Sequence, residues 1–178
     1  MLRAAIDRYV ACERIDVQAL AGELGVGRAT IYRWFGSREG LLGEVLVATA
    51  QHEVRVARRA ARGSGGKRLL DTFHRINSAL ASAPNLRHFL REERETALRM
   101  VASGAGPVQP VMVRMIREII EEEADAGRYD PPTDSETLAY AVVKLAEAFI
   151  FNDAIADVRG EVDRLRDVEA ALLGVTRA

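Results

Sequence analysis

Apolar residues recur along the whole chain at the spacing of an α-helix. Near the N-terminus Leu2, Ile6 and Tyr9 fall three or four positions apart, and the same spacing returns in each later segment. No stretch alternates apolar and polar residues for long enough to predict a sheet, and no segment repeats another. We therefore predict an all-α protein.

Three short helices are predicted at the N-terminus. The first covers residues 2–11, and Asp16 is placed to cap the second, because its carboxylate can accept a bond from a free amide N–H. Gly25 is expected to end the second helix. The third buries Ile31 and Phe35, one helical turn apart. Two short helices joined by a tight glycine turn and braced by a preceding helix form a helix-turn-helix.

The outer face of the third helix carries an unusual set of side chains. With Ile31 and Phe35 inside, this face holds Arg28, Ala29, Thr30, Tyr32, Arg33 and Trp34. An exposed aromatic pair is costly without a partner. One alternative is that Tyr32 and Trp34 pack against the next helix. The other is that their O–H and N–H groups bind DNA phosphates, while the arginines reach phosphates or base edges in the major groove.

A fourth helix is predicted to start after Ser37 and to run to Arg62. Ser37 is a suitable N-cap, and Glu39 lies near the positive end of the helix dipole. The later part of this helix has a basic stripe, which we interpret as a solvated face: Arg55, Arg58, Arg59 and Arg62. Residues 63–66, Gly-Ser-Gly-Gly, are typical of a linker.

Every periodic segment after this linker also predicts a helix. These segments lie near residues 69–83, 86–90, 97–101, 108–127, 135–157 and 162–173. Thr133 and Glu136 are expected to form a capping box at the start of the helix from Ser135. That helix is apolar almost all round and needs burial on two sides. One side is expected to face its own domain, and the other a second subunit, with the last helix beside it.

Composition and charge add few constraints. The 178 residues are 48% apolar, which is enough for a core, and the net charge of −1 does not by itself indicate nucleic acid. Basic residues outnumber acidic ones up to Arg62, so the rest of the chain is acidic on balance. Cys12 is alone, which excludes an internal disulfide and a multi-cysteine metal site. With no signal peptide and no membrane-spanning run, we expect a cytoplasmic protein without a membrane partner.

The residues that would indicate an enzyme are missing from the sequence. The three histidines lack metal-ligand spacing, and there is no phosphate-binding glycine loop, nucleophile elbow or HExxH motif. We therefore expect no catalytic residue, no metal and no cofactor, and a small-molecule-binding enzyme is the less favoured alternative.

The N-terminal segment resembles the DNA-binding domain of the TetR family of bacterial transcriptional regulators. The family pattern is met at Leu20, Ala21, Gly25, Val26, Thr30, Tyr32, Phe35 and Arg38, and Leu41 and Leu42 close it. Three positions depart from the pattern. Gly27 stands where a serine usually caps the recognition helix, Trp34 replaces the commoner histidine, and Arg38 replaces the commoner lysine.

The resemblance implies a regulator that binds double-stranded operator DNA as a homodimer, most simply a repressor released by a small-molecule effector. Residues 1–45 would be the DNA-binding domain, and residues 46–178 the effector-binding and dimerisation domain, with the last two long helices as the dimer interface. The implied DNA contacts are Gln18, Gly27, Arg28, Ala29, Thr30, Tyr32, Arg33, Trp34 and Arg38. The alternative is an interaction protein that keeps the scaffold without binding an operator.

In this family the C-terminal helices enclose the effector, and such sites are mostly apolar with a few polar anchors. The candidate wall residues are Phe73, Ile76, Leu80, Phe89, Leu98, Met112, Met115, Ile116 and Phe149. The candidate anchors are Asn77, Tyr140, Glu147 and Asn152. Ordinary core packing is the alternative for each wall residue, and a surface pair with Lys144 is the alternative for Glu147. Residues 145–156 are similar to a TetR subgroup that regulates quorum-signal degradation, which implies a largely apolar, lactone or acyl-like effector.

Overall fold

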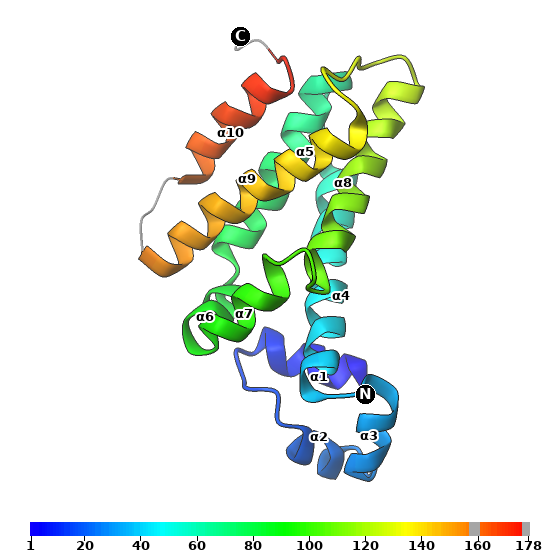
Figure 1. Ribbon diagram of the computed structural model, residues 1–178, viewed down its shortest axis with the longest axis vertical. Coiled ribbons are helices and arrows are strands. Elements are labelled where there is room, and N and C mark those ends of the chain that lie inside the picture. The colour runs from blue at the N-terminus through cyan, green and yellow to red at the C-terminus, as the bar shows by residue number, and fades with distance from the viewer. Residues whose placement is uncertain (157–160, 176–178) are drawn as a thin grey trace.

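A computed structural model describes residues 1–156 and 161–175, except the side chains of 152–156. These residues form ten α-helices and no strand, which confirms the predicted fold class. The molecule is elongated, with a small helical unit at one end and a larger bundle at the other (Figure 1). We call the small unit, α1 to α3, the head, and the bundle the body.

The head is the predicted helix-turn-helix. Its helices are α1 (Leu2–Val10), α2 (Val17–Glu23) and α3 (Arg28–Phe35). The Asp16 carboxylate accepts the backbone N–H groups of Gln18 and Ala19 at 2.7 and 3.0 Å, and these bonds lower the pKa of Asp16. Ile31 has no exposed surface, whereas Phe35 is only partly buried. The predicted cap of α2 and the inward side of α3 are thereby confirmed.

A single long helix, α4 (Arg38–Ala60), connects the head to the body (Figure 1). Ser37 caps it as predicted, because the Ser37 hydroxyl accepts the N–H of Gly40 at 2.9 Å. The first half of α4 buries Leu42 and Leu46 in a cluster that contains the head, while Val54 and Ala57 lie in a second cluster inside the body. One helix therefore belongs to both hydrophobic cores.

The body consists of α5 (Gly65–Ser82), α6 (Pro84–Glu92), α7 (Arg94–Val101), α8 (Val108–Asp125), α9 (Ser135–Ala156) and α10 (Glu161–Leu172). The short helices α6 and α7 lie at the end of the body nearest the head (Figure 1). Phe89 of α6 packs edge-on against Tyr9 of α1, with ring centroids 6.3 Å apart. Within the described ranges, no helix is long and apolar enough to cross a membrane.

Residues 63–66 are not simply a linker, because α5 already begins at Gly65. The N–H of Gly65 donates to the buried carboxylate of Glu123 at 2.8 Å. A Cβ atom at Gly65 would collide with the backbone oxygen of Arg128. Glycine is therefore required at position 65 by close packing, and the predicted linker is shortened to Gly63 and Ser64.

The cap of α9 also differs from the prediction. Asp134, rather than Thr133, accepts the N–H of Thr137 at 2.8 Å. Glu136 does not turn back to the helix start as a capping box requires, since its carboxylate binds Arg117 at 2.8 Å. The two candidate caps are adjacent in the sequence, and the carboxylate is the stronger acceptor.

The body contains a buried acid that the sequence analysis did not single out. Glu169 of α10 has no exposed surface, and its Oε1 accepts the Asn77 amide of α5 at 2.9 Å. Its Oε2 is buried without a hydrogen-bond partner in the described part of the chain. Burial raises the pKa of the Glu169 carboxyl to about 7.

We predict that Glu169 makes the stability of the protein depend on pH. Protonated Glu169 contributes to the free energy of unfolding. This contribution is fully present below the ordinary glutamate pKa of 4.5 and is lost as pH rises through about 7. The loss amounts to roughly 3 kcal/mol. At pH 8, Glu169→Gln should therefore unfold at a higher urea concentration than the unmodified protein. At pH 5 the difference between the two urea midpoints should be smaller. Exposed Glu118→Gln is the matched control; a Glu169→Gln gain that is equal at both pH values contradicts the assignment.

Candidate DNA-binding surface and effector cavity

The outer side of α3 forms the candidate reading surface, which we define as Arg28, Ala29, Tyr32, Arg33 and Trp34. All five residues are exposed, Trp34 to 57% and Tyr32 to 38%. The alternative that the two aromatic rings are buried against the next helix therefore does not hold. The Arg28 guanidinium lies over the Tyr32 ring, 6.0 Å from its centroid, which orients both side chains. Gln18 of α2 is also exposed, whereas Thr30 is half-buried.

The N-terminus of α3 is open. Gly27 takes the N-cap position in an extended conformation (φ −73°, ψ 145°) and supplies no side-chain bond. A Cβ atom added at Gly27 would meet no atom within 4 Å. The first amide groups of a helix have no partner within the helix. The start of α3 can therefore be approached by another molecule, as the missing serine implies.

Arg38 does not belong to the reading surface, contrary to the sequence prediction. Its Nη1 and Nη2 donate to the two carboxylate oxygens of Glu93 at 2.8 and 2.6 Å, and its Nε donates to the carbonyl of Ile15 at 2.8 Å. The hydrogen bond from Arg38 lowers the pKa of Glu93. Three of the five N–H donors of Arg38 are engaged in these bonds, which fix the position of the guanidinium. Arg38 instead ties the start of α4 to the junction of α6 and α7.

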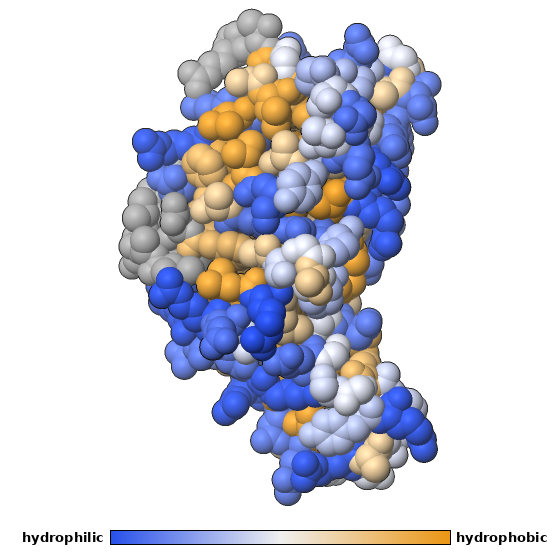
Figure 2. Space-filling view, in the orientation of Figure 1, coloured by the Kyte–Doolittle hydropathy of each residue, from blue (hydrophilic) through white to orange (hydrophobic). Residues whose placement is uncertain are grey.

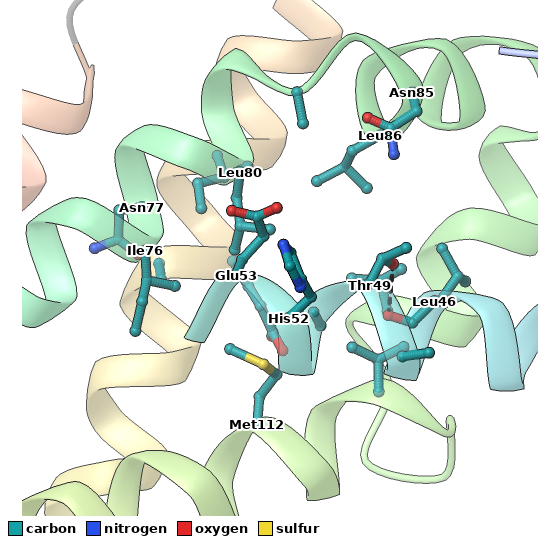
Figure 3. Close-up of a pocket in the computed structure, with 18 of the residues that line it drawn as sticks. Leu46, Thr49, His52, Glu53, Ile76, Asn77, Leu80, Asn85, Leu86 and Met112 are labelled. Carbon is teal, nitrogen blue, oxygen red and sulfur yellow. Dashed lines mark hydrogen bonds between the residues drawn. The ribbon is translucent and has the colours of Figure 1, made fainter. Parts of the chain in front are cut away.

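A cavity of about 640 Å³ lies where α4, α5, α6, α8 and α9 meet, and α1 borders it from the head side (Figure 3). This volume is in the range of small-molecule sites. Seven of the predicted effector residues line it: Phe73, Ile76, Asn77, Leu80, Met112, Ile116 and Glu147. Pairs of adjacent α9 residues, repeated every four positions, face the cavity: 142 and 143, 146 and 147, 150 and 151.

Five predicted residues lie elsewhere, which corrects the predicted set. Phe89 packs on Tyr9 near the head, and Tyr140 is 51% exposed on another face of α9. Leu98, Met115 and Phe149 are partly buried but do not border the cavity. These three were chosen for apolar character alone, and helix rotation turns them away. The side chain of Asn152 lies outside the described residues.

The carboxylate of Glu147 is at the cavity wall and is already neutralised. It accepts the Lys144 ammonium at 2.6 Å and the amide of buried Gln109 at 2.8 and 3.0 Å. Lys144 and Gln109 also donate to the carbonyl of Ala102. The two interpretations of Glu147 therefore coincide, because this residue both pairs with Lys144 and lines the cavity.

Sequence reasoning missed the contribution of α4 and of the head to this cavity. Leu46, Thr49, His52 and Glu53 of α4 line it, and so do residues of α1 such as Ile6. Positions 46, 49 and 53 of α4 share one helical face, so periodicity could have indicated them. The contribution of α1 could not be found in this way, because it depends on how the head docks on the body.

Comparison with known proteins agrees with this two-part architecture. The profile described as "Bacterial regulatory proteins, tetR family" matches residues 13–45, and the profile "Tetracyclin repressor-like, C-terminal domain" matches residues 64–174. No sequence among the curated proteins matches.

Three solved structures are similar. The R. erythropolis transcriptional repressor QsdR, from the TetR family, is 32% identical with a TM-score of 0.89, over 99% of this chain and 94% of that chain. A protein described as a transcriptional regulator from Pseudomonas aeruginosa PAO1 is 20% identical, with a TM-score of 0.57 over 97% of this chain and 88% of that chain. One described as a TetR-family regulator from Rhodococcus sp. is 18% identical, with a TM-score of 0.54 over 98% and 97%. These last two show the fold alone.

A helix-turn-helix head on a helical body is the architecture of a DNA-binding transcriptional regulator, and the matched profiles and the QsdR structure are of regulators. The chain belongs to the TetR family of bacterial transcriptional regulators.

We predict that the Arg38–Glu93 pair stabilises the junction of head and body. A double-mutant cycle of Arg38→Ala and Glu93→Ala should give a coupling energy of about 1.5 kcal/mol in urea unfolding at pH 7. Both side chains are less than one-third exposed, so 0.5 M salt should reduce the coupling only partly. The exposed Arg3–Asp7 pair is the control, with coupling near zero. Equal coupling energies for the two pairs contradict a role for Arg38 at the junction.

Proposed function

We propose that this protein is a repressor that binds a palindromic operator as a homodimer and is released by a small molecule in the body cavity. The observation that carries the proposal is the reading surface, where two exposed aromatic rings and two arginines lie on a short helix. Residues 1–45 act as the DNA-binding unit and residues 46–178 as the effector-binding and dimerisation unit.

The reading surface suits the major groove of DNA. Arg33 makes no hydrogen bond or ion pair with the described residues, so its five N–H donors are free for phosphates or guanine edges. Tyr32 and Trp34 present one donor each, which suits phosphate oxygens. Gln18, Gly27 and Thr30 flank this surface and complete the proposed contact set.

Dimerisation through α9 and α10 is the arrangement that we infer for the body. Apolar side chains gather over the α9 and α10 side of the molecule (Figure 2). On this pair of helices Tyr140 is 51% and Val168 is 41% exposed, which is unusual for large side chains without a partner. A two-fold dimer would present two heads to successive major grooves, about 34–36 Å apart.

Effector binding can reach the head by two direct routes. The cavity wall includes Ile6 of α1, so a bound molecule would touch the head itself. It also includes Asn85 and Leu86 of α6, the helix that ends beside Glu93 and its ion pair with Arg38. A ligand that binds more tightly to one position of the head than to another would shift the population of dimers towards that position. Fewer dimers would then have the spacing between heads that fits DNA. Such a regulator acts on DNA in the bacterial cytoplasm.

We predict that Arg33→Ala lowers operator affinity about tenfold or more. The measurement is a titration of the DNA flanking its own gene at fixed salt concentration, because affinities for DNA depend steeply on salt. Exposed Arg59→Ala, far along α4 from the reading surface, is the control and should retain full affinity. Unchanged binding by the Arg33 variant would remove Arg33 from the contact set.

Footprinting of the same flanking DNA tests the alternative of an interaction protein without an operator. The absence of any protected palindrome would favour that alternative.

A second prediction concerns the cavity. The apolar dye N-phenyl-1-naphthylamine should bind the unmodified protein. Met112→Trp should weaken dye binding about tenfold or more, because Met112 lines the cavity and the larger indole takes up part of its space. Operator affinity of the variant should stay within about twofold, since Met112 lies far from α3. Circular dichroism checks that the variant folds. Retained dye binding by a folded Met112→Trp variant contradicts the cavity as the binding site.

A further inference from the structure

Of the carboxylates that line the cavity in the described part of the chain, one has no partner. Glu53 of α4 is half-buried and lines the cavity. Figure 3 shows its side chain beside those of His52 and Leu80. Across the described residues the carboxylate of Glu53 accepts no hydrogen bond, and no basic group lies within ion-pair distance of it.

The other charged groups around the cavity are compensated or turned outward. Asp7 of α1 pairs with Arg3 at 3.1 Å, and Glu147 of α9 pairs with Lys144 at 2.6 Å. Arg55 of α4 also borders the cavity, but its side chain is exposed to solvent, whereas Glu53 is half-buried. Glu53 is therefore the carboxylate that sets the charge preference of the cavity.

The surroundings of Glu53 are mainly apolar. Leu80 of α5 lies beside it, and Ile76 of α5 and Met112 of α8 line the same cavity (Figure 3). A molecule that fills this space expels the water that now solvates the carboxylate. A carboxylate that loses water without gaining a donor is strongly unfavourable, and a second carboxylate beside it is worse. A bound ligand must therefore bring a hydrogen-bond donor to Glu53, and a cationic donor gives the strongest bond.

We propose that the cavity selects a molecule with an apolar body and an ammonium head, that Glu53 binds the head, and that carboxylates of the same shape are excluded. This inference rests on the proposed role of the cavity as the effector site. It differs from the lactone or acyl class implied by the sequence resemblance, because ester and acyl carbonyls offer only acceptors to Glu53. His52, beside Glu53 at the same wall, is available to orient the head.

Three probes with the same chain separate the head-group chemistries: decylamine, 1-decanol and decanoate. Each is titrated into the full-length protein at pH 7, below its micelle concentration, and its affinity is measured by displacement of N-phenyl-1-naphthylamine. We expect decylamine to bind about tenfold or more tightly than decanoate, with 1-decanol between them. Glu53→Gln should bring the three affinities to within about threefold of one another.

Glu44→Gln is the matched control, because Glu44 is an exposed glutamate of α4 that does not line the cavity. This variant should keep the preference for decylamine. Decanoate binding as tightly as decylamine to the unmodified protein overturns the proposal. So does a preference that survives in Glu53→Gln, or a failure of all three probes to displace the dye.

A separate measurement keeps this inference distinct from the proposed function. Operator binding is titrated with and without saturating decylamine. If decylamine binds through Glu53 and leaves operator affinity unchanged, the proposed ligand class is supported. In that case binding of this ligand in the cavity does not regulate DNA binding. If the operator is released by other molecules while decylamine does not bind, the proposed function is supported and the ligand class is wrong.

Discussion

The two hydrophobic cores of the molecule share one helix, and this sharing limits how the head can move. The first half of α4 buries Leu42 and Leu46 with the head, and its second half buries Val54 and Ala57 with the body. A helix of 23 residues is about 35 Å long and does not bend easily. Residues of α4 also form part of the cavity wall, so a displacement of α4 at the cavity would be transmitted to the head. The Arg38–Glu93 pair adds a second link at the same junction.

Local signals in the sequence predicted much of the fold. Asp16 and Ser37 cap their helices as expected, because capping depends only on the next three residues. The inward position of Ile31 and the exposure of Tyr32 and Trp34 also follow from the helical period. The cap of α9 was misplaced by one residue, since Thr133 and Asp134 are both good caps and only the geometry of the turn decides between them.

Contacts between distant residues could not be predicted in this way. Arg38 and Glu93 are 55 positions apart, and Asn77 and Glu169 are 92 apart. In each case the sequence shows a polar residue but not its partner. Arg38 was therefore predicted to contact DNA, and the bond from Asn77, which does line the cavity, to Glu169 was not predicted. The cavity was predicted only in part for the same reason. Its body helices have clear apolar stripes, whereas its border with α1 depends on docking of the head.

The turn between α3 and α4 has a consequence for how such a regulator can diverge. Gly36 has φ +73°, a conformation that other residues rarely adopt, and a Cβ atom at Gly40 would collide with the carbonyl oxygen of Phe35. These two positions are closed to substitution. By contrast, Arg28, Ala29 and Arg33 are exposed and bury nothing in the head. Duplicated copies of this gene could therefore acquire new operator preferences by changing the reading surface, with little loss of stability, while the angle at which α3 is presented stays the same.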